Sequence, residues 1–92
     1  MPILDDKLRE VNSIRFEAHV MVLEFADGGT ASAPYWWYPR LLNATDAQRR
    51  NYRMSGRGRG IHWPDIDEDL SVNGILEGRK APRAMPPSVA AE

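Results

Sequence analysis

The sequence predicts a small single α+β domain, with a three- to four-stranded antiparallel sheet in meander order and two short helices. Three observations lead to this fold class. Short segments before residue 34 are rich in β-branched and aromatic residues and alternate between apolar and polar positions. A D-G-G turn separates two of these segments, and a T-x-x-Q helix start follows them. The length of 92 residues leaves room for one modest core and no second domain.

Three strands are expected in the first third of the chain. Apolar and polar residues alternate in Val11–Phe16, as in a strand with one buried face. Val20–Phe25 is apolar on both faces almost to its end, which favours a central strand. Asp27–Gly29 supplies the positive-φ residues that a tight hairpin needs. Thr30–Ala33 is therefore expected to return as a third strand that ends at Pro34.

Capping residues mark two helix starts. Thr45 and Gln48 have the spacing of a capping box, in which each side chain accepts a hydrogen bond from the other residue's backbone N–H. A short helix is therefore expected over about residues 46–54. Ser71 can cap a last helical turn that Gly78 closes.

The segments between and after these helices are less regular. Residues 55–60, S-G-R-G-R-G, are expected to end the first helix and to form a mobile loop. Ile61–Trp63 can add a fourth strand before Pro64. Residues 81–92 are proline-rich and have no apolar period, so the folded domain is expected to cover residues 1–80 and the remainder to be a disordered tail.

The composition excludes several classes of protein. The chain has no cysteine, which excludes disulfides and cysteine-ligated zinc. It has no signal-peptide segment, and no stretch approaches the roughly 20 apolar residues that span a bilayer. We therefore expect a cytoplasmic protein that makes no membrane contact. The net charge of −1 argues against the basic footprint of a general nucleic-acid binder.

Two opposite charge blocks are adjacent in the sequence. Residues 45–60 hold five arginines and one aspartate, a net charge of +4, and residues 61–70 hold four carboxylates, a net charge of −4. The arginines could form a phosphate-tracking loop on glycine hinges, with Tyr52 or Trp37 available to stack on a base. They could also be surface residues partly paired with the acidic block, where each exposed pair contributes only about 0–1 kcal/mol. The five are Arg49, Arg50, Arg53, Arg57 and Arg59.

The acidic block contains possible metal ligands, which are His62, Asp65, Asp67 and Asp69. An imidazole and carboxylates suit several divalent cations. The spacing nevertheless fits no known metal motif, because Leu70 stands where an EF-hand loop requires glycine. Aspartates beside a helix start also favour capping. We therefore expect no metal and no cofactor, and a metal-dependent enzyme at these four residues is retained as an alternative.

Four consecutive aromatic residues, Tyr35 to Tyr38, form the densest apolar feature of the chain. A helix or a strand would point them to different faces. Trp36 and Trp37 could belong to the core and cover a sheet edge, or they could form a binding hot spot. Tryptophan and arginine are the residue types that dominate binding energies at interfaces, which favours a partner.

The segment LLNATDAQRRNYRMSGRGRGIHWPDIDEDLSVNGILEG, after a strand pair that contains FADGG, closely resembles the small bacterial family called domain of unknown function 2442. The resemblance covers about Val11 to Gly78 and is most specific from Gly60 to Leu76. Two arginines in S-G-R-G-R-G and the residue Asn73 depart from the family pattern and make this chain locally more basic. The resemblance implies an α+β domain with a strand-to-helix junction next to the Ser71 cap. The residues that would shape this junction are Trp63, Pro64, Asp67 and Asp69.

The resemblance also implies a functional context. Members of the family look like companions of other proteins, sometimes encoded in toxin–antitoxin-like pairs. We therefore expect a non-enzymatic protein-binding module, antitoxin-like or an inhibitor of another macromolecule. The alternative is a nucleic-acid-binding domain that uses the Arg49–Arg59 loop, directly or through the partner. An edge strand and exposed tryptophans would also allow a homodimer. The expected partner-binding residues are Trp36, Trp37, Arg49, Arg50, Arg53, Arg57 and Arg59.

Overall fold

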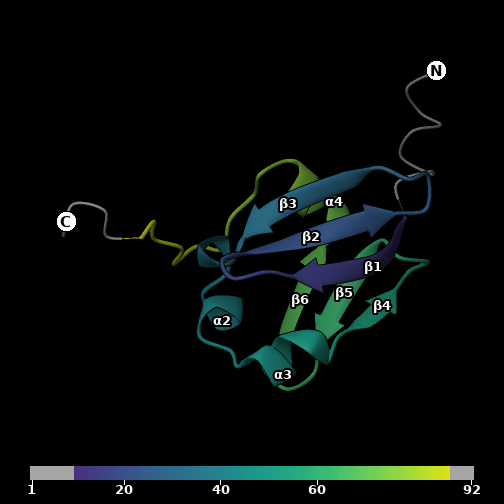
Figure 1. Cartoon of the computed structure of the whole chain (residues 1–92). Helices are drawn as coiled ribbons and strands as arrows, with labels where there is room; N and C mark the ends of the chain where they lie inside the picture. The colour runs from purple at the N-terminus through teal and green to yellow at the C-terminus, as the bar shows by residue number, and fades with distance from the viewer. Residues whose placement is uncertain (1–9, 88–92) are drawn as a thin grey trace.

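The computed structural model describes residues 10–87, in which two antiparallel sheets lie on either side of one core (Figure 1). The sheets have the strand orders β1-β2-β3 and β4-β5-β6. The strands are β1 (Val11–Phe16), β2 (Val20–Phe25), β3 (Thr30–Pro34), β4 (Arg53–Ser55), β5 (Gly60–Trp63) and β6 (Glu68–Ser71). The helices are the 3-10 helix η1 (Tyr35–Trp37) and the α-helices α2 (Pro39–Leu42), α3 (Asp46–Arg50) and α4 (Val72–Leu76). The α+β fold class is confirmed.

The first sheet has the three strands that the sequence predicts. β2 is central and pairs antiparallel with both neighbours. Its hairpin with β3 is closed by the Phe25 N–H, which donates to the Gly29 carbonyl oxygen at 2.9 Å. Gly28 has a φ of 93°, a conformation that costs glycine little and other residues more. The predicted D-G-G turn is therefore confirmed.

The second sheet was only partly predicted. Ile61–Trp63 forms a strand as expected, within β5, but it pairs with β4 and β6 and not with the first sheet. The acidic stretch does not lead directly from strand to helix. Residues 64–67 form a hairpin turn, and β6 intervenes before α4 begins. The predicted cap is present at the end of β6, where the Ser71 Oγ accepts the Gly74 N–H at 2.9 Å.

Helix α3 starts as predicted and ends four residues early. The complete capping box is formed by Thr45 and Gln48. The helix ends at Arg50 and not at Met54, because the next residues have tertiary partners on β1. The Tyr52 Oη accepts the Ile14 N–H at 3.2 Å, and the Tyr52 ring packs on Phe16 with centroids 5.7 Å apart.

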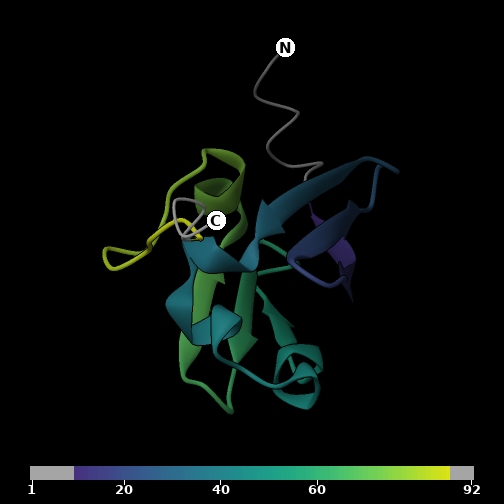
Figure 2. The ribbon, with the colours of Figure 1, turned by 60° about the vertical axis from the view of Figure 1, so that its left-hand side comes forward.

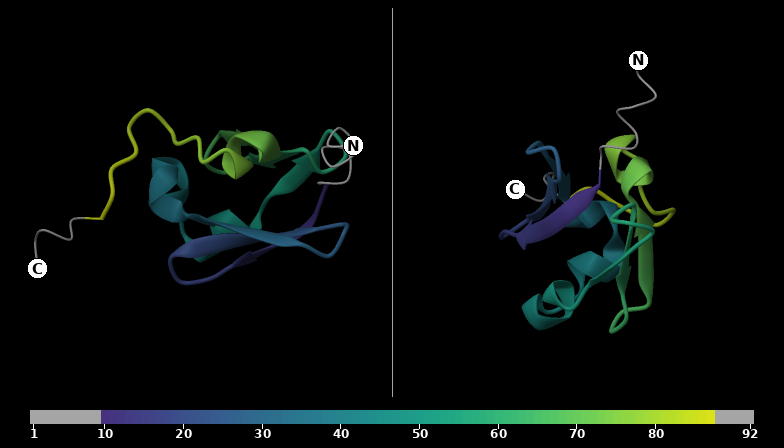
Figure 3. Two further views of the ribbon diagram at one scale, coloured as in Figure 1. Left: turned by 90° about the horizontal axis from the view of Figure 1, so that it is seen from above. Right: turned by 90° about the vertical axis from the view of Figure 1, so that its right-hand side faces the viewer.

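The core lies between the two sheets, as the turned views show (Figures 2 and 3). Met21 and Leu23 of β2 contribute from the first sheet and Ile61 and Trp63 of β5 from the second, all with at most 1% of their surface exposed. The Trp63 indole N–H donates to the Arg49 carbonyl oxygen at 2.9 Å, so its polar atom is satisfied. Burial of a tryptophan of this kind contributes about 3–5 kcal/mol relative to alanine.

The segment after α4 folds back over the helical side of the domain. The Ala81 N–H donates to the Trp37 carbonyl oxygen at 3.0 Å, and Ala81 packs against the core. Of the predicted tail, residues 81–87 are described and residues 88–92 lie outside the described residues. Residues 1–9 of the predicted domain also lie outside them. Within residues 10–87, every helix is too short or too polar to cross a membrane.

Candidate functional site

An apolar hollow opens beside the aromatic segment. It has a volume of about 370 Å³ and is bounded by η1, the end of α2 and the turn between β1 and β2. Trp36 is half-buried at this hollow, and Leu42 exposes 47% of its surface there. Leu42 is one of three large apolar side chains that are exposed among the described residues. The lining residues are Ala18, His19, Tyr35, Trp36, Leu42, Arg49 and Pro87.

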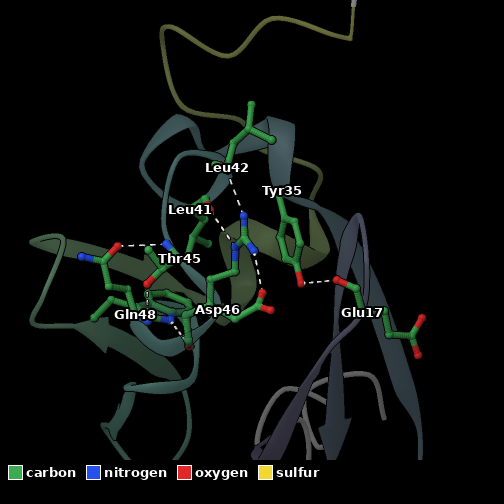
Figure 4. A network of polar contacts seen from close by, with 9 residues as sticks. Glu17, Tyr35, Leu41, Leu42, Thr45, Asp46 and Gln48 are labelled. Atoms are coloured by element: carbon green, nitrogen blue, oxygen red, sulfur yellow. Dashed lines mark hydrogen bonds and ion pairs between the residues drawn. The ribbon is translucent and has the colours of Figure 1, made fainter.

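Arg49 lines this hollow. Figure 4 shows the network of polar contacts beside it, in which Leu41, Leu42 and Asp46 take part. The Arg49 guanidinium donates to the carbonyl oxygens of Leu41 and Leu42 at 2.8 and 3.0 Å, and it pairs with Asp46 at 3.2 Å. It also lies 4.2 Å from the Tyr35 ring centroid, the geometry of a cation–π contact. Only 12% of the Arg49 side chain is exposed. Sequence reasoning placed Arg49 among the partner-binding residues, whereas these contacts give it a structural role at the end of α2.

The Tyr35 side chain connects this corner to the first sheet. Its hydroxyl donates to the Glu17 carbonyl oxygen at 2.6 Å, so η1 is tied to the first hairpin. Burial raises the pKa of the Tyr35 hydroxyl above its ordinary value, which keeps this donor neutral further into the alkaline range.

Trp37 differs from Trp36 in its surroundings. Its ring packs against the core and meets Tyr38 edge to face, with centroids 6.2 Å apart. The Lys80 ammonium lies 4.7 Å from the Trp37 ring centroid and Ala81 binds the Trp37 backbone, so the segment after α4 covers this side chain. Both tryptophans are half-buried, but Trp37 packs against the core whereas Trp36 lines the hollow.

The remaining predicted arginines lie elsewhere. Arg53, Arg57 and Arg59 are exposed on the β4–β5 hairpin, which is at the far side of the domain from η1 and α2 (Figure 1). Arg50 is exposed at the end of α3. The structure thus separates the predicted binding residues into an aromatic corner, which includes Arg49, and a basic hairpin.

The acidic turn between β5 and β6 connects three parts of the fold. The Asp67 residue has a φ of 53°, and its carbonyl oxygen accepts a hydrogen bond from Arg40 of α2. The Asp65 carboxylate accepts the Asn51 amide N–H at 3.0 Å. Pro64 is exposed at the start of this turn. These contacts place the turn as a connection between α2, the end of α3 and the second sheet.

The side chains of the four possible metal ligands do not converge on one point. His62 Nδ1 lies 2.8 Å from an Asp69 carboxylate oxygen, across the β5–β6 pair, whereas Asp65 binds Asn51. Among residues 10–87, no three histidine, aspartate or glutamate side chains are placed to hold one metal ion. The geometry therefore gives the metal-dependent alternative no support.

One half-buried acid was not predicted. Glu68 exposes only 13% of its side chain and lines two adjoining hollows of about 290 and 420 Å³, on either side of Ala81 and Pro82. Burial raises the pKa of its carboxyl group, while Arg40, at 3.9 Å, and the Asp69 N–H act in the opposite direction. Burial also raises the pKa of the neighbouring Tyr38 hydroxyl to about 12. The alternation of apolar and polar residues in the sequence does not reveal that Glu68 is shielded, because the segment that folds back after α4 contributes to this shielding.

Comparisons with known proteins identify a family and two similar structures. A family described as protein of unknown function (DUF2442) matches residues 11–81. No curated protein matches the chain. A crystal structure of a protein of unknown function from Rhodospirillum rubrum is 26% identical, with a TM-score of 0.72, over 83% of this chain and 94% of that one. A solution structure of an uncharacterized protein from Chromobacterium violaceum is 24% identical, with a TM-score of 0.71, over 89% of this chain and 77% of that one. These similarities support the fold.

Proposed function

Because this chain belongs to the family described as protein of unknown function (DUF2442), which carries no assigned activity, we propose a function from its surface: it is a non-enzymatic module that binds a partner protein. The observation that carries the proposal is the apolar hollow at Trp36 and Leu42. The module would act in the cytoplasm, as an antitoxin-like protein or as an inhibitor of that partner.

The chemistry of the hollow supports a protein partner. A half-buried tryptophan at an apolar hollow, with an exposed leucine beside it, offers the aromatic anchor that is typical of the centre of a protein interface. The partner is therefore expected to insert an apolar side chain between Trp36 and Leu42. Arg49 would line the hollow without being available to the partner, since its guanidinium is engaged within the domain.

The surroundings of the titratable groups support a non-enzymatic function. His62 and Asp69 form a pair on an open sheet face. Arg53 of β4 lies opposite His62 on the other side of β5. A general base also needs a substrate position within hydrogen-bond reach and shielding from water. Glu68 is half-buried, but its observed partners are Arg40 and a backbone N–H.

Capture from a lysate of the native host tests the proposal. The lysate is treated with nuclease, so that a retained protein cannot be held through nucleic acid. Leu42→Glu would place a charge in the hollow, and Leu76→Glu is the matched control on α4, where Leu76 exposes 38% of its surface. We expect a stoichiometric protein that wild type and Leu76→Glu retain and that Leu42→Glu and Trp36→Ala lose. Equal retention by all four proteins, or the absence of any stoichiometric protein, would contradict the proposal.

A further inference from the structure

The basic hairpin between β4 and β5 has an unusual backbone. Gly56, Arg57 and Gly58 have φ values of 56°, 62° and 78°, so three consecutive residues are left-handed. The turn is closed by the N–H groups of Gly58 and Arg59, which both donate to the Ser55 carbonyl oxygen at 3.1 Å. A left-handed conformation is unfavourable for arginine, and positions of this kind cluster at functional sites.

The hairpin is also fixed to the rest of the domain, although the sequence predicts a mobile loop. The Gly58 carbonyl oxygen accepts the Val11 N–H at 2.9 Å, and the Arg59 carbonyl oxygen accepts the Val72 N–H at 2.8 Å. A β-carbon at Gly58 would lie 2.7 Å from the Val11 carbonyl oxygen, so the contact with β1 requires glycine. The arginines of the hairpin are thus presented from a fixed base.

The charges of this hairpin are not neutralised by the acidic block. Between residues 10 and 87, none of the ion pairs includes Arg53, Arg57 or Arg59. Asp65 and Asp67 lie in the other turn of β5, at the opposite end of that strand. Arg57 and Arg59 are therefore separated from that acidic turn by the length of β5, whereas Arg53 lies opposite His62 at the other end of the strand.

The surroundings of the arginines are polar. Arg53 and Ser55 share the outer face of β4, since Met54 between them packs against the core. Their register partners on β5 are His62 and Gly60. The exposed large apolar side chains of the described region are Leu42, Leu76 and Met85, and none belongs to the hairpin. A surface of this kind lacks the apolar centre of a protein interface.

The β4–β5 hairpin, all of which the structure describes, also offers no free aromatic side chain on which a base could stack. Tyr52, the aromatic residue nearest to the hairpin in sequence, is engaged with Ile14 and Phe16 of β1. Arginine and serine side chains without an aromatic platform suit phosphate oxygens, which take half or more of the hydrogen bonds in protein–DNA complexes.

We propose that the β4–β5 hairpin is a second binding surface, which contacts the phosphodiester backbone of duplex nucleic acid through Arg53, Arg57 and Arg59 without reading its sequence. This proposal does not depend on the protein-binding hollow. Three phosphate contacts correspond to a slope of about −2.7 for the logarithm of affinity against the logarithm of salt, or about a 40-fold loss of affinity between about 50 and 200 mM salt.

Fluorescence anisotropy with a short labelled DNA duplex of mixed sequence tests the surface. The informative variant is Arg57→Gly, because it removes a guanidinium and also relieves the left-handed conformation. We expect unchanged or higher thermal stability, weaker binding at low salt, and a slope reduced by about one. Arg57→Gly combined with Arg59→Ala should lose most of the binding. Arg83→Ala, an exposed arginine outside the hairpin, is the control and should bind as wild type does.

Three results would overturn the proposal. The first is no binding of the duplex by the wild-type chain at low salt. The second is binding that Arg57→Gly and the double variant leave unchanged. The third is equally tight binding of polyglutamate of matched charge, which would make the hairpin a site for acidic protein segments and not for phosphodiesters.

Discussion

The Arg49 guanidinium carbon lies 4.2 Å from the centre of the Tyr35 ring, and this contact joins α3 to η1. Arg49 also binds the two carbonyl oxygens at the end of α2, so one side chain connects three short helices. Each of these helices has five residues or fewer and could not persist alone. The positions of Trp36 and Leu42 at the hollow therefore depend on Arg49, which connects the helices that carry them.

Replacement of Arg49 should destabilise the domain. Arg49→Ala removes two hydrogen bonds to backbone carbonyl groups and the contact with Tyr35, and we expect a loss of about 2 kcal/mol in the free energy of unfolding. Arg50→Ala, on the same helix with an exposed side chain, should change stability by less than about 0.5 kcal/mol. Denaturant unfolding of both variants measures the difference, and equal effects would show that Arg49 is an ordinary surface residue.

Gly58 should be far less replaceable than Gly56. Gly58→Ala would place a methyl group against the Val11 carbonyl oxygen in a left-handed conformation, with an expected loss of about 2 kcal/mol or more. At Gly56 the nearest atom would be 3.9 Å away, so Gly56→Ala should cost only about 1 kcal/mol, from the backbone conformation alone. Thermal unfolding of the two variants compares them. A Gly58→Ala variant as stable as Gly56→Ala would mean that the hairpin is not held against β1.

Glu68 should make stability depend on pH. Its pKa in the folded protein is raised above the ordinary value of 4.5, so the folded state binds the proton more tightly than the unfolded chain does. Stability contributed by this group should therefore fall as pH rises from 4.5 through the raised pKa. Glu68→Gln should melt at a higher temperature than wild type at neutral pH.

The difference between Glu68→Gln and wild type should vanish below pH 4.5, where both side chains are neutral. Glu17→Gln is the control, since Glu17 exposes 52% of its side chain and no comparable change is expected there. Melting curves across this range measure both variants. A Glu68→Gln variant less stable than wild type at neutral pH would mean that the ion pair with Arg40 outweighs the cost of burial.

The first sheet and the helix caps could be predicted because their signals are local. β2 contains a continuous apolar run, the turn before β3 contains D-G-G, and the Thr45 and Ser71 caps stand directly before their helices. β4 and β6 gave no such signal. They have three and four residues, R-M-S and E-D-L-S, and they are strands only because they pair with β5 on both sides.

The candidate surfaces were less predictable than the fold. Tryptophan and arginine can be singled out from the sequence as residue types common at interfaces, but their grouping depends on tertiary structure. Arg49 is held by carbonyl groups of α2, and Trp37 is covered by Lys80 and Ala81. Neither contact follows from periodicity or spacing. The exposure of Leu42 beside a hollow also could not be predicted, because that hollow is formed by α2 and the β1–β2 turn, which are distant in sequence.

The affinity of the captured partner for Leu42→Glu and for Leu76→Glu tests the central claim most directly. Both changes place one carboxylate at an exposed leucine, so they have the same effect on net charge and differ only in position. The account predicts that titration calorimetry finds affinity reduced about 30-fold or more for Leu42→Glu, equivalent to about 2 kcal/mol, and unchanged for Leu76→Glu. Equal affinities for both variants and wild type would contradict the account.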